Sequence, residues 1–226
     1  MTFTDTFENA RDNGRDRPAR AVLWDMDGTL IDSEPIALEA LANALTQVGV
    51  EPRRDVLDAA VGMSADALYA MVCDEFCISC SNAEWEALKH EYYFSNLHRV
   101  PVISEAVEVW HLLAAKGVRQ AVVTNSDRII TDANLRHIQM AAPGAISVCR
   151  NDVRHGKPEP EPYLRAAWLL GVDPHEALVI EDSIGGAKSG LTAGMQTLIV
   201  PQSTIRPPNG ATKLHSYREI YSAISD

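Results

Sequence analysis

Five short apolar segments constrain the fold of this chain more than any other feature of its sequence. Each is a continuous hydrophobic run, which is typical of parallel strands buried on both faces. From the second run onward, a helical pattern separates each run from the next, as in a doubly wound sheet. The predicted strands are Ala21–Trp24, Ala121–Thr124, Ala145–Cys149, Ala177–Ile180 and Gln196–Val200, and the predicted helices between the later strands are Asp127–Gln139, Pro160–Leu170 and Gly185–Ala193.

About a hundred residues separate the first two predicted strands, far more than a connection inside one sheet needs. Apolar residues recur there at three- and four-residue intervals, which predicts helices. We therefore expect an α/β fold, with a Rossmann-like doubly wound parallel core (20–33 and 100–226), an inserted all-helical cap domain (34–99) and a flexible polar leader (1–19). The predicted cap helices are Pro35–Val48, Arg53–Ala60, Ala65–Phe76 and Asn82–Leu97, and Ser104–Ala115 leads into the second strand.

The charge of the chain limits its partners. Its 31 acidic and 20 basic residues give a formal net charge of -11, which repels nucleic-acid phosphates and anionic lipid surfaces. A phosphorylated metabolite meets the same repulsion, so its site needs a local cation or a metal ion. The sequence shows no apolar run of the ~20 residues that span a bilayer and no secretion signal, so we expect a cytoplasmic protein that binds neither nucleic acid nor membrane.

Two carboxylates follow the first predicted strand. Asp25 is the first residue beyond it, and Asp27 comes two residues later, before Gly28. Open α/β sheets bind their ligands at the carboxyl ends of the strands. There, Asp25 is placed to attack phosphorus as a nucleophile, and Asp27 to give and take protons. The alternative is a plain turn, since Asp-Gly pairs commonly follow strands without catalytic purpose.

The next three strand ends also carry polar groups. We expect Thr124 and Asn125, after the second strand, to bind phosphate oxygens, and Lys157, after the third, to bind phosphate and keep Asp25 ionised. Glu181 and Asp182 follow the fourth strand and offer the oxygen ligands that Mg²⁺ prefers. Alone, each has another explanation, such as a helix cap or a surface lysine. Together they form the set that phosphoryl transfer requires.

The order of these groups resembles that of the haloacid dehalogenase-like hydrolases, over about Arg20 to Val200. The resemblance implies that Asp25 is the nucleophile and a Mg²⁺ ligand, and that Asp27 is the acid/base and ligates the metal through its backbone carbonyl. It also implies that Asp182 is a further ligand, that Glu181 supports the metal site, and that the cap closes over substrate. The matching motifs are Asp25–Leu30, Thr124, Lys157-Pro158 and Glu181-Asp182.

The resemblance also narrows the reaction. Dehalogenating members lack the second aspartate, so Asp27 favours a phosphatase that hydrolyses a small phosphoester, such as a sugar phosphate, through an aspartyl-phosphate. The alternative is a mutase of the β-phosphoglucomutase type. That family carries a histidine and an arginine where this chain has Ala37 and Ala65, and both departures favour hydrolysis. Cap-bearing members are often monomeric, so a monomer is expected.

Two interpretations come from other classes of protein. Cys73, Cys77 and Cys80 have the spacing with which radical enzymes bind an iron–sulfur cluster. Their helical flanks and the lack of a nearby Gly-rich segment favour structural thiols instead. A scaffold that retained a dead site is the other alternative, and the complete set of charged residues at the strand ends argues against it.

Several further polar or aromatic side chains are candidates for contact with substrate. In the cap, an aromatic stripe at helical spacing is more often core than pocket, and a histidine before the lysine loop is more often a surface residue. We therefore expect the aromatic group to be core. The candidates are Lys89, His90, His98, Arg99 and His155, with the aromatic group Trp85, Tyr92 and Tyr93.

Overall fold

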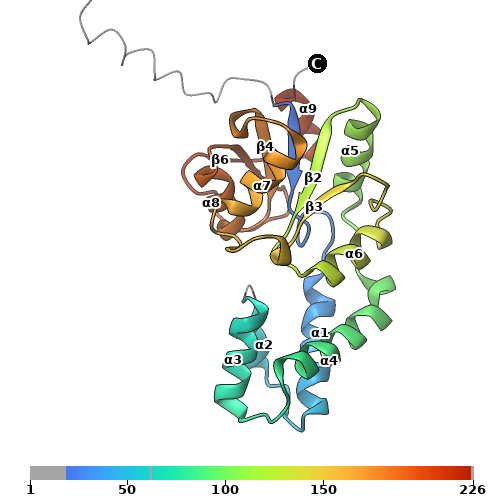
Figure 1. The fold of residues 1–226 in the computed structure, drawn as a ribbon, viewed down its shortest axis with the longest axis vertical. Helices are drawn as coiled ribbons and strands as arrows, with labels where there is room; N and C mark the ends of the chain where they lie inside the picture. The colour runs from blue at the N-terminus through green and yellow to red at the C-terminus, as the bar shows by residue number, and fades with distance from the viewer. Residues whose placement is uncertain (1–18, 62, 225–226) are drawn as a thin grey trace, which may run out of the picture.

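A computed structural model describes residues 19–61 and 63–224 (Figure 1). The predicted leader thus lies outside the described residues except for Ala19. That residue is buried, its backbone N–H donates to the carbonyl of Ala223 at 2.8 Å, and it pairs with Ile224. Ala19 therefore belongs structurally with the core. None of the helices in the described part of the chain is long and apolar enough to cross a membrane.

One sheet of parallel strands forms the centre of the core, in the order β3-β2-β1-β4-β5-β6. The five predicted strands are all present, with ends that differ by up to two residues. The sixth is a short, exposed edge strand without an apolar run, and the sequence pattern missed it. The strands are β1 (Ala21–Trp24), β2 (Arg119–Val123), β3 (Ile146–Val148), β4 (Ala177–Glu181), β5 (Gln196–Ile199) and β6 (Ala211–Lys213).

Helices cover both faces of the sheet, as the doubly wound fold requires. Side chains alternate along β1, so Val22 and Trp24 belong to the apolar cluster that includes residues of α5, α6 and α9, whereas Leu23 belongs to the cluster that includes residues of α7. All residues of β1 are fully buried, which explains their continuous hydrophobicity. The core helices are α5 (Ser104–Ala115), α6 (Arg128–His137), α7 (Glu161–Leu170), α8 (Ile184–Thr192) and α9 (Ile220–Ala223).

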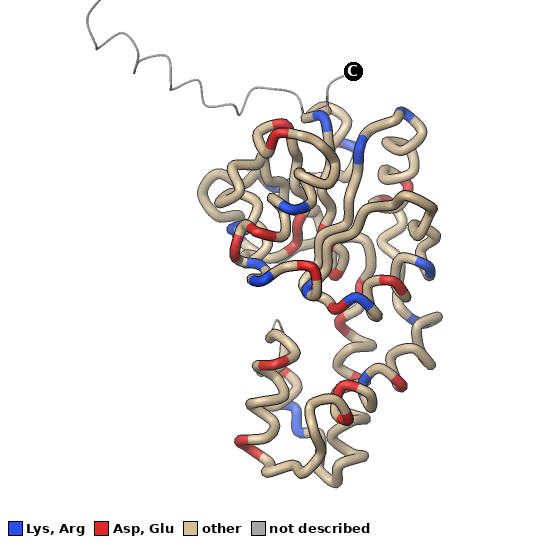
Figure 2. Tube along the Cα trace, in the orientation of Figure 1, with Lys and Arg blue, Asp and Glu red and all other residues tan. Residues whose placement is uncertain are grey.

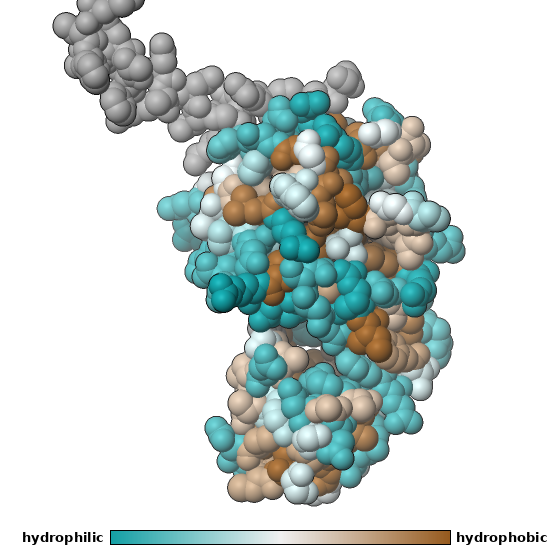
Figure 3. Space-filling model, viewed as in Figure 1, coloured by the Kyte–Doolittle hydropathy of each residue, from teal (hydrophilic) through white to brown (hydrophobic). Residues whose placement is uncertain are grey.

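The helices α1 to α4, which follow β1 and precede α5 in the described chain, form the predicted cap, which lies beyond the carboxyl ends of the strands (Figure 1). A proline in the first turn starts α1, and a capping box between Ser81 and Glu84 starts α4. The tips of α2 and α3 point toward the core across a hollow, and the core surface there is mostly hydrophilic (Figure 3). The cap helices are α1 (Glu34–Gln47), α2 (Arg54–Ala60), α3 (Ala65–Phe76) and α4 (Asn82–Ser95).

The apolar contacts of the cap divide between two clusters. Near the core, Ile36 and Tyr93 pack into the main cluster that includes Trp24 of the sheet. Farther out, Leu45 and Trp85 belong to a separate cluster with residues of α2 and α3. The long pair α1 and α4 is therefore anchored in the core at one end and forms the outer cap at the other.

Candidate active site

The site lies where the strand order reverses. The chain leaves β1 for β2 and β3 on one side and returns at β4 on the other, and open α/β sheets bind ligands at such a point. Trp24 pairs with Ile180 in the register, so the next residues, Asp25 and Glu181, emerge side by side. The backbone N–H of Asp25 donates to the Ile180 carbonyl at 2.9 Å. Charged residues gather along this edge of the core (Figure 2).

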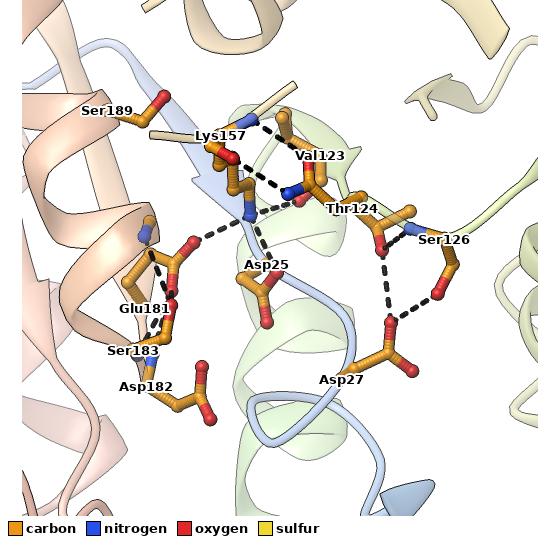
Figure 4. A network of polar contacts seen from close by, with 12 residues as sticks. Asp25, Asp27, Val123, Thr124, Ser126, Lys157, Glu181, Asp182, Ser183 and Ser189 are labelled. Carbon is orange, nitrogen blue, oxygen red and sulfur yellow. Dashed lines mark hydrogen bonds and ion pairs between the residues drawn. The ribbon is translucent and has the colours of Figure 1, made fainter. Parts of the chain in front are cut away.

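Lys157 joins the two acidic strand ends (Figure 4). Its ammonium donates to Asp25 Oδ1 at 2.6 Å, to Glu181 Oε1 at 2.6 Å and to the Val123 carbonyl at 2.7 Å. The ring of Tyr163 lies 4.9 Å away, and its hydroxyl donates to Glu181 Oε1 at 2.9 Å. Because a lysine ammonium has three N–H donors, these contacts use all of them. In this arrangement Lys157 has no N–H donor left for a further ligand.

One ammonium cannot neutralise three neighbouring carboxylates. Burial, together with the charges of Glu181 and Asp182, raises the pKa of Asp25 well above its usual value, although Lys157 opposes this. Burial and the charge of Glu181 raise the pKa of Asp182 to about 7. Burial alone would also raise the pKa of Glu181, but the charge and hydrogen bond of Lys157 outweigh it, so that pKa is lowered. Burial would lower the pKa of Lys157, but Asp25 and Glu181 raise it, so Lys157 stays charged.

The donors at this edge fit a hard divalent cation. Asp25 Oδ2 is buried and has no hydrogen-bond partner. Oxygens of Asp25, Glu181 and Asp182 lie within 4.8 Å of one another, and the side chains of Asp25 and Asp182 face the same space (Figure 4). Crowded carboxylates with raised pKa values favour Mg²⁺, because its charge relieves their repulsion and it prefers oxygen ligands.

Glu181 has a different environment from the other two carboxylates. Its Oε1 accepts from Lys157 and Tyr163, and its Oε2 accepts from the Ser183 hydroxyl at 3.0 Å and from the backbone N–H groups of Asp182 and Ser183. The side chain is completely buried. Both oxygens are thus occupied by protein donors, so Glu181 orients Lys157 and the turn after β4.

Gly28 lets the two acidic loops touch. Its φ is +84°, a conformation that favours glycine, and a Cβ there would lie 2.1 Å from Asp182 Oδ2. Any side chain at residue 28 would therefore displace Asp182. The glycine sets how closely the loop after β1 approaches the loop after β4.

Asp27 is surrounded by hydroxyl groups. Its Oδ2 accepts from Ser126 Oγ at 2.8 Å and Thr124 Oγ1 at 3.0 Å, and its Oδ1 accepts from Ser33 Oγ at 2.5 Å. Ser33 directly precedes the first cap helix. The predicted phosphate-binding hydroxyl of Thr124 therefore contacts the predicted acid/base in this structure.

Asn125 orders the lysine loop. Its side-chain oxygen accepts from the Lys157 backbone N–H at 2.9 Å, and its side-chain nitrogen donates to the Lys157 carbonyl at 3.0 Å. A Cβ at Gly156 would lie 2.6 Å from that oxygen, so the loop needs glycine there. Asn125 is exposed, beside the predicted phosphate site.

The other candidates from the sequence have separate positions. Trp85 and Tyr93 are buried, as expected of core, and Tyr92 is half-buried. His90 Nε2 lies 3.1 Å from Asp127 Oδ2, which links α4 to the start of α6. The remaining candidates are placed as follows: Lys89 pairs with Glu86, Arg99 pairs with Glu39, and His98 and His155 are exposed.

The cap cysteines show no common site. Cys77 is exposed, whereas Cys73 and Cys80 are half-buried. Within the described ranges, the groups of side chains that are close enough to share a metal ion do not include these thiols. The structure thus gives the iron–sulfur interpretation no ligand set.

Sequence reasoning missed two residues that organise the site. Tyr163 orients Glu181 from α7, and Ser33 contacts Asp27 from the start of the cap. A weak signal existed for Tyr163, since it follows the lysine loop at the spacing of an inward-facing helix position. Ser33 precedes Glu34 and Pro35 and reads as an ordinary helix start, so nothing local indicated its contact.

Comparison with known proteins places this geometry in context. The family profile described as haloacid dehalogenase-like hydrolase matches residues 22–200. The N-acetylmuramic acid 6-phosphate phosphatase of Pseudomonas aeruginosa is 34% identical over 83% of this chain and 84% of that protein. Hexitol phosphatase A of Escherichia coli is 30% identical over 89% of this chain and 93% of that protein. CbbY from Rhodobacter sphaeroides, solved in complex with phosphate, shares the fold, with a TM-score of 0.78 at 19% identity over 89% of this chain and 96% of that chain.

Proposed function

The chain belongs to the haloacid dehalogenase-like hydrolases, and on this basis we propose that it is a magnesium-dependent phosphatase acting on a small phosphorylated metabolite. The observation that carries the proposal is Asp25, whose Oδ1 is held by Lys157 while its buried Oδ2 has no partner. An oriented carboxylate with one unused oxygen is a ready nucleophile for phosphorus.

The reaction has two steps. In the first, Asp25 Oδ2 attacks phosphorus, the bond from phosphorus to the ester oxygen breaks, and Asp27 protonates the departing alcohol. In the second, Asp27 removes a proton from water, the water oxygen attacks the phosphorus of the aspartyl-phosphate, and the carboxylate of Asp25 leaves. Inorganic phosphate is released, and both aspartates return to their starting states.

Different side chains hold Asp25 and Asp27, so the two carboxylates have separate positions and separate roles. Lys157 holds Asp25 and opposes the charge of the phosphate, while Ser33, Thr124 and Ser126 hold Asp27. Mg²⁺, held by Asp25, Asp182 and the backbone carbonyl of Asp27, would supply the positive charge that phosphoryl transfer needs. This local positive charge would offset the repulsion between the acidic protein and a phosphorylated substrate.

A sugar phosphate or polyol phosphate is the substrate class that we favour. The relatives named above are phosphatases of N-acetylmuramic acid 6-phosphate and, by its name, of hexitol phosphates. Hydrolysis is favoured over isomerisation because Ala37 and Ala65 stand where the resembling mutases carry a histidine and an arginine. The cap above the site would exclude water from the first step.

The test is phosphate release from a panel of sugar and polyol phosphates, with Mg²⁺ or with a chelator, including β-glucose 1-phosphate. We expect release that requires Mg²⁺ and falls by at least about a thousandfold in Asp25→Asn, because a carboxamide cannot form the acyl phosphate. Isomerisation of glucose 1-phosphate without phosphate release would establish the mutase instead. Folded, Mg²⁺-loaded protein that turns over none of the esters would refute the proposed phosphatase.

A further inference from the structure

The segment after β5 contacts both acidic loops of the site. Gln202 Nε2 donates to the carbonyl of Gly28 at 2.8 Å, in the loop that carries Asp25 and Asp27. The next residue, Ser203, donates from Oγ to the carbonyl of Asp182 at 2.5 Å. Two consecutive residues thus bridge two loops that are more than 150 residues apart in the chain. We call Gln202 and Ser203 the clip.

The clip is itself supported from the core. Tyr217 is buried, its hydroxyl donates to the Thr29 carbonyl at 2.8 Å, and it lies 2.8 Å from Gln202 Nε2. Its ring is stacked on that of Trp24, with centroids 6.4 Å apart. Lys213 on β6 donates to the Ser203 carbonyl at 2.7 Å. These contacts fix the clip against the central strand and the edge strand.

The clip opposes a force that acts at the site. Asp25 and Asp182 carry like charges when both are ionised, and Coulomb repulsion between them then pushes their loops apart when no metal ion is present. Gly28 lies so close to Asp182 that even a Cβ would not fit between them. Hydrogen bonds from one short segment to both loops hold this close approach. The acceptors of these hydrogen bonds are backbone carbonyl oxygens, so the carboxylate oxygens stay available to bind a metal ion.

We propose that Gln202 and Ser203 are positioning residues that fix the distance between the nucleophile loop and the Asp182 loop, so that Mg²⁺ meets preformed carboxylates. The inference rests on the proposed function for the identity of the ion. Residues that orient metal ligands from behind typically change metal affinity by 10- to 100-fold when they are removed. Gln202 is exposed, so its truncation opens no cavity in the core.

The experiment compares Gln202→Ala, Ser203→Ala and the double variant with the native chain. Ser203→Thr retains the hydroxyl, Gln202→Glu retains the size but loses the donor, and Thr204→Ala is the matched control beside the clip. Mg²⁺ binding is measured by calorimetry without substrate, followed by kcat and KM for the best ester, and by thermal unfolding with a chelator.

We expect the double variant to bind Mg²⁺ about 10-fold more weakly. At subsaturating Mg²⁺, kcat of the double variant should fall below that of the native chain, and it should recover at high Mg²⁺. The KM for the ester should change less than twofold. Gln202→Glu should resemble Gln202→Ala, whereas Ser203→Thr and Thr204→Ala should bind Mg²⁺ like the native chain.

Unchanged Mg²⁺ affinity in the double variant would overturn the clip, even if the phosphatase activity is confirmed. So would a weaker affinity accompanied by general unfolding of the double variant at assay temperature, because that result indicates a structural role. A native chain that binds Mg²⁺ but hydrolyses no ester would refute the phosphatase, while the calorimetry would still decide the clip.

Discussion

At the scale of single residues, Lys157 is the buried cation that pairs with two carboxylates of the site. Its side chain is 5% exposed and pairs with Asp25 and with the fully buried Glu181. Removing one member of a buried ionic group leaves an unpaired charge in the protein interior, which typically lowers stability by about 3–5 kcal/mol. We expect Lys157→Met to lower the free energy of unfolding by this amount and to abolish turnover.

Urea unfolding with a chelator at neutral pH measures the change. Lys188→Met, at an exposed lysine of α8, is the matched control and should change stability by less than about 0.5 kcal/mol. A loss below about 1 kcal/mol in Lys157→Met would show that the buried carboxylates are not held ionised by this lysine.

Asp182 gives a second prediction at this scale, a pH dependence. Its pKa in the metal-free fold is about 7, above its ordinary value of 3.8. The folded state therefore holds a proton that the unfolded state has already lost between these values. The stability that the group contributes is complete below about pH 4 and is lost as pH rises to about 7. The unfolding free energy of the native chain minus that of Asp182→Asn should therefore fall as pH rises from about 4 to about 7.

The difference between the two proteins removes the titration of groups that Asp182 does not affect. Chemical denaturation in EDTA at several pH values from 4 to 8 provides the measurement. A native-minus-variant difference that stays constant, or that rises with pH, would contradict the raised pKa of Asp182.

At the scale of elements, the cap has its own apolar cluster, which includes the fully buried Trp85. A Trp→Ala change in such a cluster typically costs about 3–5 kcal/mol. Because the cluster is separate from the core clusters, we expect Trp85→Ala to loosen α2 and α3. The backbone amides of the sheet should stay protected from hydrogen exchange. Hydrogen exchange followed by mass spectrometry should show faster exchange in Arg54–Phe76 and unchanged exchange in β1 and β4.

Trp85→Phe is the control for this prediction. The indole nitrogen of Trp85 is buried without a hydrogen-bond partner, so phenylalanine keeps most of the packing and loses no bond. Equal acceleration of exchange in the cap and in the sheet of Trp85→Ala would show that the molecule opens as one unit.

The sequence predicted elements well where they follow a local rule. The buried strands are continuous apolar runs, and the cap helices show helical periodicity, so both were found. The edge strand β6, which reads Ala-Thr-Lys and is largely exposed, has neither signal. At the site, polar or charged residues directly follow the first four strands, so the sequence pattern could point to them. Tyr217 could not, because its contact with Thr29 joins residues 188 positions apart and only the fold brings them together.

At the scale of the whole molecule, net charge gives a kinetic prediction. A protein with charge -11 repels a dianionic ester at a distance, and salt screens this repulsion. With Mg²⁺ saturating, we expect kcat/KM for a sugar phosphate to rise about twofold between about 0.01 and 0.15 M ionic strength, as the Debye length falls from about 30 to 8 Å. Steady-state kinetics in sodium chloride tests this. A fall in kcat/KM would indicate that the positive field of the site dominates approach.

The position of β1 in the sheet has a consequence for biosynthesis. It is the first strand among the described residues but lies between β2 and β4, and β4 begins only at residue 177. During translation, the edge of the wholly apolar strand β1 that pairs with β4 therefore stays unpaired until most of the polypeptide has been made. Long-range pairing of this kind folds slowly, and unpaired strand edges associate with other chains. Nascent chains that end before β4 should thus depend on chaperones, and this dependence should fall once Ala177–Glu181 has left the ribosome.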